Sequence, residues 1–276
     1  MRTFHSPAGG SLLAIPLGVL LLAFGGLLVS GCSAKEDAYD SPEETTTATE
    51  APASLNYVAL GDSLAVGLRA DRGYVDRYAD YLKADTGAQV SVVNLGQSGE
   101  TSSQLLYALR NDSFSRQAIS AANVITFNIG INDLGHASEA YENDTCGGDD
   151  NQECLRAAVE TFKENWNAII AELLGLRSTR DTIIRTAGLG YTPYVFIDEA
   201  SDTRPSSGRL DSFRILKPYV DEANRHVAAT TTDNDIPYAE VYLGEGDISP
   251  DGVHPNDEGY QVIADQLREL GYGPLR

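Results

Sequence analysis

Residues 57–67 read YVALGDSLAVG. An apolar run from Tyr57 to Leu60 stops at Gly61, and Asp62 and Ser63 follow at once. Such a run before a glycine is typical of a buried strand that ends in a turn. Because Gly, Asp and Ser are all common in turns, this stretch alone leaves open whether Ser63 is a turn residue or a nucleophile.

Apolar runs rich in β-formers recur at 56–61, 89–95, 123–129, 181–187 and 236–242. Helical spacing of apolar residues lies between or after them, at 74–85, 155–176, 211–230 and 257–270. Strands that alternate with helices indicate a parallel sheet covered on both faces. We therefore predict an α/β fold over 54–276, a flavodoxin-like three-layer α/β/α sandwich with a five-stranded parallel sheet.

The charge of the chain limits its partners. Its 276 residues include 40 acidic and 20 basic side chains, for a formal net charge of −20. Such a protein repels the phosphates of nucleic acids and of anionic membranes. We expect no nucleic-acid partner, a monomer, and membrane contact only through an anchor.

The N-terminal region carries the pattern of such an anchor. An apolar segment from Leu12 to Val29 ends in LLVSGC, with small residues before Cys32. This pattern is typical of a signal peptide and resembles a bacterial lipobox, which implies cleavage before Cys32 and lipidation of its thiol. The alternative is an uncleaved membrane-spanning helix. We expect a signal peptide over 1–31, a flexible acidic linker over 32–53, and a domain outside the cytoplasm as a cell-surface lipoprotein.

Two further cysteines, Cys146 and Cys154, form an even pair in that oxidising location. We predict a disulfide between them. The acidic residues of the enclosed segment match no calcium-ligand spacing, so a solvated loop tip is the preferred interpretation.

Polar residues follow the predicted strands, and in open parallel sheets ligands bind at the carboxyl ends of the strands. Ser63 follows the first strand, and two glycines follow the second. Asn132 and Asp133 follow the third, and Asp251 and His254 come after the fifth. These residue types suit acyl transfer.

Each residue type has a chemical role in such a reaction. Ser63 becomes a nucleophile when His254 takes its proton, and Asp251 can orient the imidazole. An oxyanion needs fixed donors, and Ser63 N–H, Gly99 N–H and the Asn132 amide can supply them. Gly96 is the competing choice for the glycine.

Four short segments now indicate a family: GDSL at 61–64, QSGETS at 97–102, GIND at 130–133 and DGVHP at 251–255. In this order they resemble the four sequence blocks of the SGNH, or GDSL, hydrolases. The resemblance covers essentially all of 55–276 and implies the flavodoxin-like fold. It also implies a serine ester hydrolase, since the family includes esterases, lipases, lysophospholipases, thioesterases and carbohydrate deacetylases.

The remaining acidic residues and histidines near the motifs are not expected to take part in the reaction. We expect Asp62 and Asp133 to bond local loop amides, because an anion beside the oxyanion would oppose catalysis. His226 is expected on a helix surface, and His136 at the mouth of the site. Isolated histidines do not form a zinc site, so we predict no metal and no cofactor.

The substrate stays open between lipid or lysophospholipid esters, short acyl esters and acetylated carbohydrate. The segments 134–153 and 190–208 are expected to be loops at the rim of the pocket. The second contains Tyr191, Tyr194, Val195, Phe196 and Ile197, which either line an acyl site or pack the loop down. A different class also stays open, a catalytically silent binding module on the same fold.

Overall fold

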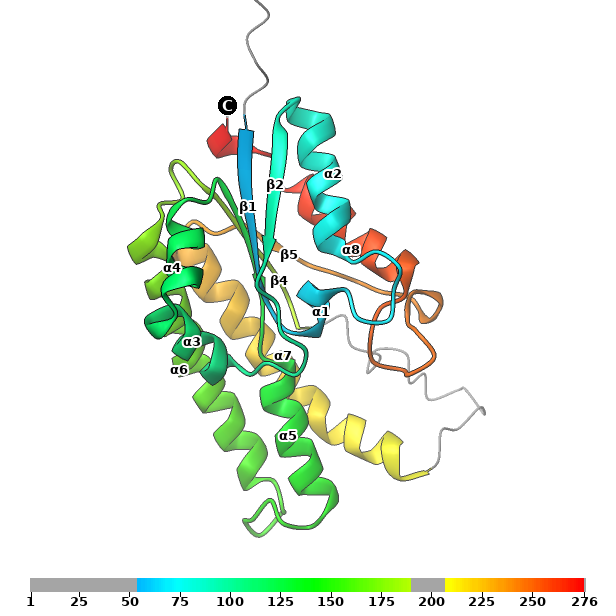
Figure 1. The fold of residues 1–276 in the computed structure, drawn as a ribbon. Helices are drawn as coiled ribbons and strands as arrows, with labels where there is room; N and C mark the ends of the chain where they lie inside the picture. Colours follow the sequence, from blue (N-terminus) through cyan, green and yellow to red (C-terminus); the bar gives the residue numbers. More distant parts are fainter. Residues whose placement is uncertain (1–53, 190–206, 276) are drawn as a thin grey trace, which may run out of the picture. The chain divides into compact units, whose positions relative to one another are not determined.

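The computed structural model describes residues 54–189 and 207–275 (Figure 1). The expected signal peptide, Cys32 and the linker lie outside these residues. The five apolar residues of the segment 190–208 lie outside them too.

The fold is built on one five-stranded parallel sheet with the strand order β2-β1-β3-β4-β5. The strands are β1 (Ser54–Gly61), β2 (Gln89–Asn94), β3 (Val124–Asn128), β4 (Ile183–Ala187) and β5 (Tyr238–Ala239). This order is that of flavodoxin-like sheets, so the predicted fold class is confirmed. The last strand is shorter than the predicted 236–242. It lies at an edge, and Pro237 at its start has no N–H to donate.

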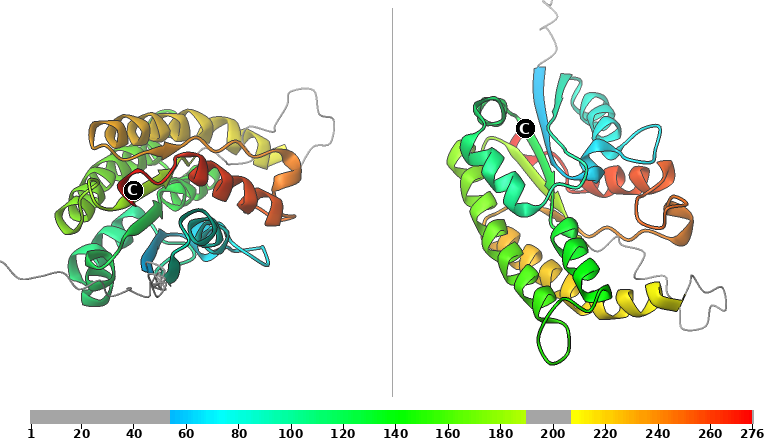
Figure 2. Two further views of the ribbon diagram at one scale, coloured as in Figure 1. Left: turned by 90° about the horizontal axis from the view of Figure 1, so that it is seen from above. Right: turned by 60° about the horizontal axis from the view of Figure 1, so that its bottom comes forward.

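Helices cover both faces of the sheet (Figures 1 and 2). On one face lie α2 (Tyr74–Thr86) and α8 (Asp257–Glu269). On the other lie α3 (Ser102–Asn111), α4 (Ser113–Ser120), α6 (Glu153–Leu176) and α7 (Ser207–Asp233). Alternate residues of β1 enter the two cores, with Val58 and Leu60 on the α6 side and Tyr57 and Ala59 on the α2 side. The nearly continuous apolar run of this strand is thus explained by burial on both faces.

Four helices of the described residues were not predicted: the short α1 (Ser63–Val66), α3, α4 and α5 (Ile131–Glu142). The prediction of a loop over 134–153 is wrong for its first part, because α5 continues to Glu142. A signal for α3 is present in the sequence, since Thr101 and Gln104 form a capping box at its start.

The predicted disulfide between Cys146 and Cys154 is present in the structure, with 4.8 Å between the Cα atoms. Cys154 lies in the first turn of α6, so the bond ties the segment after α5 to the start of that helix. Within the described ranges, no helix is long and apolar enough to cross a membrane.

Candidate active site

Ser63 lies at the carboxyl edge of the sheet, just after the inner strand β1. Gly61 ends this strand with a φ of +127°, and a Cβ there would lie 2.0 Å from the carbonyl oxygen of Asn128. Only glycine fits this position. Asp62 then caps the short helix α1 (Ser63–Val66) by accepting a hydrogen bond from Leu64 N at 3.0 Å. Ser63 is thereby fixed as the first residue of that helix.

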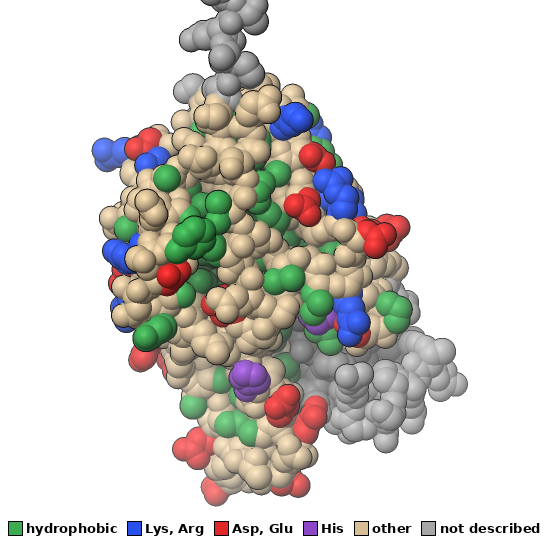
Figure 3. All heavy atoms as spheres, in the orientation of Figure 1, with side chains coloured by type: hydrophobic (Ala, Val, Ile, Leu, Met, Phe, Trp, Pro, Cys, Tyr) green, Lys and Arg blue, Asp and Glu red, His purple; other side chains and the backbone are tan. Residues whose placement is uncertain are grey.

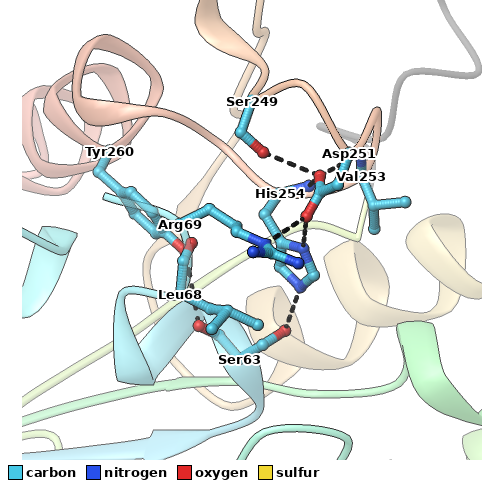
Figure 4. A network of polar contacts seen from close by, with 8 residues as sticks. All are labelled: Ser63, Leu68, Arg69, Ser249, Asp251, Val253, His254 and Tyr260. Carbon is cyan, nitrogen blue, oxygen red and sulfur yellow. Dashed lines mark hydrogen bonds and ion pairs between the residues drawn. The ribbon is translucent and has the colours of Figure 1, made fainter. Parts of the chain in front are cut away.

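His254 faces Ser63 from a loop that precedes α8 (Figure 4). Its Nε2 lies 3.0 Å from Ser63 Oγ, and its Nδ1 lies 2.8 Å from Asp251 Oδ2. With Nδ1–H donated to the carboxylate, the Nε2 lone pair is available to the serine proton. The structure thus brings together the three residues that the sequence singled out, across 191 positions of the chain.

The spacing of Asp251 and His254 is explained by hydrogen bonds inside their loop. Asp251 Oδ1 accepts from Ser249 Oγ at 2.8 Å, and from Val253 N and His254 N at 3.0 Å each. Burial alone raises the pKa of Asp251. The bonds donated by the His254 and Val253 amides, the imidazole and Ser249 outweigh burial, and the pKa is well below its usual range. In the folded protein, Asp251 is therefore ionised at neutral pH.

Gly99 lies in the turn that follows β2. Its φ is +79°, a Cβ there would meet nothing within 4 Å, and its N–H has no partner among the described residues. Gly96, by contrast, donates its N–H to Asn94 Oδ1 at 3.0 Å, and a Cβ there would lie 2.6 Å from Ala65 Cβ. Gly96 therefore serves the packing of α1, and Gly99 is the one placed to donate to a ligand.

Asn132 lies in the first turn of α5 rather than in a loop. Its Nδ2 donates to the carbonyl oxygen of Glu100 at 2.8 Å and approaches Asp62 Oδ2 at 3.4 Å. The second contact is at the long limit for a hydrogen bond. One amide hydrogen is thus firmly bound and holds the side chain in place, whereas the other is weakly bound.

Three carboxyl groups lie near these donors. Asp62 is fully buried, and burial raises its pKa to about 7. Burial, and then the proximity of Asp62, raise the pKa of Glu100 to about 7 as well. Burial also raises the pKa of Asp133, which accepts from Ser102 N at 2.9 Å. The expected bond of Asp62 to a local amide is present, whereas the amide that Asp133 binds is that of Ser102, 31 positions away at the start of α3. Raised pKa values reduce the negative charge beside the site.

Glu100 was not predicted as a site residue, because the QSGETS motif carries no signal that this side chain is buried. One carboxyl oxygen of Glu100, Oε2, is buried and has no hydrogen-bond partner among the described residues. A neutral carboxyl group tolerates such a position better than a carboxylate.

A groove of about 420 Å³ runs from Gly99 along α3. It is lined by amide and hydroxyl side chains and by the aromatic ring of Tyr107, which is 69% exposed. The lining residues are Gln97, Ser98, Gly99, Glu100, Ser103, Gln104, Tyr107 and Ala108. On the face drawn in Figure 3, charged side chains lie mostly toward the margins, with hydrophobic and uncharged groups between them.

The two other histidines of the domain are not part of the chain from Ser63 to Asp251. His226 lies on α7, where its Nε2 is 2.9 Å from Asn167 Oδ1. His136 lies on α5, one helical turn beyond Asn132. Over 54–189 and 207–275, no group of three or more His, Cys, Asp or Glu side chains is arranged to hold a metal ion.

A flavodoxin-like sheet that gathers a serine, a glycine, an asparagine and a histidine at its carboxyl edge defines the SGNH class of hydrolases. The model of the GDSL-like lipase/acylhydrolase family matches residues 59–262. The chain belongs to this family and is an ester hydrolase.

Its relatives include lipases. The chain is 28% identical over 232 residues to the spore germination lipase LipC of Bacillus licheniformis, covering 80% of this chain and 99% of that protein. Among solved structures, the lipase Lip_vut3 from a goat rumen metagenome shows 27% identity and a TM-score of 0.67, covering 80% of this chain and 100% of the other. The acetylxylan esterase Axe2 of Geobacillus stearothermophilus shares the fold, with 17% identity and a TM-score of 0.53 over 80% and 95% of the two chains.

Proposed function

We propose that the protein hydrolyses carboxylic esters through an acyl-enzyme on Ser63. The observation that supports this most directly is the hydrogen-bonded chain from Ser63 Oγ to His254 Nε2, and from His254 Nδ1 to Asp251. Lipid or lysophospholipid acyl esters and short acyl esters are the proposed substrates.

In the proposed reaction, His254 Nε2 takes the hydroxyl proton of Ser63 as Oγ attacks the ester carbonyl. The imidazolium is stabilised by the Asp251 carboxylate. Ser63 N–H, Gly99 N–H and the Asn132 amide stabilise the oxyanion. The C–O bond to the alcohol then breaks, and His254 returns the proton to the leaving oxygen. Water attacks the acyl-enzyme by the same route in reverse and releases the acid.

The experiment is hydrolysis of p-nitrophenyl esters from acetate to palmitate, with Ser63→Ala as the reference. Turnover that rises with chain length and is lost in Ser63→Ala supports a lipid esterase. Cleavage of acetate alone excludes long acyl chains. If no ester is cleaved above the background of the variant, the binding-module alternative gains support.

A second candidate, a carbohydrate O-deacetylase, is favoured by the groove beside Gly99. Its amide and hydroxyl groups suit sugar hydroxyls, and an exposed aromatic ring such as Tyr107 can stack on a sugar ring. Tyr107→Ala should then raise KM for an acetylated oligosaccharide but not for p-nitrophenyl acetate. Phe114→Ala is the matched control, because Phe114 is 60% exposed on α4 and does not line the groove.

We further propose that the protein is a lipoprotein anchored through Cys32 outside the cytoplasm. The support is the LLVSGC segment and the acidic linker after it. Metabolic labelling with a fatty acid tests this: label should appear in the natural chain and be absent from Cys32→Ser.

A further inference from the structure

Arg69 lies in the loop that follows α1, and its side chain reaches the loop that carries Asp251 and His254. Its Nε donates to Asp251 Oδ2 at 3.0 Å, across 182 positions of the chain. The same oxygen accepts from His254 Nδ1 at 2.8 Å. Figure 4 shows the guanidinium lying beside the imidazole, above Ser63. Asp251 thus has a donor on Oδ2 that the Ser63–His254 pair does not supply.

The backbone of Arg69 is strained. Its φ is +75°, in the left-handed region, where a residue with a Cβ costs about 1–2 kcal/mol. Such strain persists only when the surrounding structure fixes it. Here the preceding residue is fixed by two bonds: Leu68 N donates to Ser63 O at 3.0 Å, and Tyr260 Oη donates to Leu68 O at 3.0 Å.

The other end of the loop is fixed as well. The backbone amides of Asp71 and Arg72 donate to the carboxylate of Asp257 at 3.1 and 3.2 Å. Arg69 therefore projects from a loop that is tied to α1 on one side and to α8 on the other. These bonds restrain the backbone from which the Arg69 side chain reaches Asp251.

Comparison with Arg72 shows what is special about this ion pair. The side chain of Arg72 is 50% exposed and pairs with Asp80, which is 64% exposed. Arg69 is 59% exposed, but its partner Asp251 is only 24% exposed. An exposed pair such as Arg72–Asp80 contributes little to stability. The Arg69–Asp251 pair instead acts on a carboxylate that is bonded to His254.

We propose that Arg69 is a positioning residue for hydrolysis, which acts through Asp251 and does not contact the substrate. It holds Oδ2 toward His254 Nδ1 and fastens the loop of residues 249–254 to the loop that follows Ser63. This proposal rests on the proposed function, because it assigns Asp251 and His254 to the reaction. Small displacements of such groups lower kcat strongly.

The test compares Arg69→Ala with Arg72→Ala in the whole protein, on p-nitrophenyl acetate. Arg69→Ala should lower kcat about tenfold or more, with KM changed less than about twofold, because the defect lies in orientation and not in binding. Arg72→Ala should match the natural protein. Methylguanidinium at millimolar concentration should restore activity to Arg69→Ala, and should not affect Ser63→Ala or Arg72→Ala.

Arg69→Gly provides a second variant, because glycine adopts a φ of +75° without strain. It should fold at least as well as the natural protein and show the same loss and the same rescue. Natural kcat in both variants, a loss confined to KM, or a loss of kcat that methylguanidinium does not restore would overturn the positioning role. A natural protein without esterase activity would overturn the proposed function, and this proposal with it.

Discussion

The two halves of the candidate site are built in different ways. The Ser63 half is built on the end of the sheet: Ser63 follows the inner strand β1 and is 7% exposed, and its neighbour Asp62 is fully buried. The Asp251–His254 half is a loop, whose two side chains are 24% and 19% exposed. A single β-bridge, Ile248 to Pro255, closes this loop.

This difference shows which forces place each group. Packing and strand pairing place the nucleophile, whereas hydrogen bonds to one carboxylate place the base. A change in the Ser63 half should therefore alter stability and activity together. A change in the Asp251–His254 half should lower activity far more than stability.

The largest expected effect is that of Asp251→Asn. An amide nitrogen in place of Oδ2 would face the two donors His254 Nδ1–H and Arg69 Nε, and the imidazole would lose its preferred tautomer. We expect kcat to fall by about 10³–10⁴-fold. The melting temperature should change by only a few degrees, because an amide oxygen can keep the three bonds of Oδ1. A melting temperature that collapses with the activity would contradict the contrast between the halves.

The two halves should also respond oppositely to pH. Burial raises the pKa of Asp62 from 3.8 to about 7, so this group favours the folded state most below about pH 4 and the benefit is lost as pH rises through 7. The upper limit of that loss is about 4 kcal/mol. Asp251, with a lowered pKa, contributes stability above its ordinary pKa, and this contribution is lost as pH falls below that value.

Urea unfolding between pH 4 and 8 checks the first response. Asp62→Asn should flatten the decline in unfolding free energy between pH 4 and 7. An unchanged slope in this variant would show that Asp62 does not carry the effect.

Two glycines give a matched test of the same contrast. Gly61→Ala should destabilise the fold by about 3 kcal/mol or more, since its φ is +127° and its Cβ would overlap Asn128 O. Gly252→Ala, in the Asp251–His254 loop, has a φ of +72° but open space around the Cβ, and should cost about 1 kcal/mol. Chemical denaturation of both variants measures the difference. Equal losses would mean that the sheet edge can adjust around Gly61.

The smallest effect is expected for Tyr260→Phe. Its fully buried hydroxyl donates to Leu68 O at 3.0 Å and to Ser63 O at 3.4 Å. Loss of this bond should cost about 1 kcal/mol of unfolding free energy. Because Ser63 stays in its helix, kcat should fall by less than about tenfold. A larger loss of kcat than for Asp251→Asn would reverse the order proposed here.

Much of the fold and of the candidate site could be predicted from local patterns. Apolar runs marked all five strands, although β5 is shorter than its run, and 3.6-residue spacing marked α2, α6, α7 and α8. The residues Ser63, Asp251 and His254 could be chosen because strand ends of a parallel sheet meet at one edge. Gly99 could be preferred to Gly96 from the motif, whereas the hydrogen bonding and packing that distinguish the two glycines are seen only in the structure.

The rest depended on contacts between distant parts of the chain. Residues 131–142 begin with a motif that also suits a turn, and tertiary packing made them a helix. Nothing in GETS predicts that Glu100 is buried beside Asp62. Arg69 meets Asp251 only because the loops after α1 and before α8 are adjacent in space, and no sequence spacing encodes that.

The direction of β1 has one further consequence. The strand enters the domain at Ser54 and delivers Ser63 at its far end, about 25 Å away at the usual rise per residue. A tether attached before Ser54 would therefore hold the domain by the edge opposite the active site. The point where such a tether joins the domain and the nucleophile thus lie at the two ends of one strand.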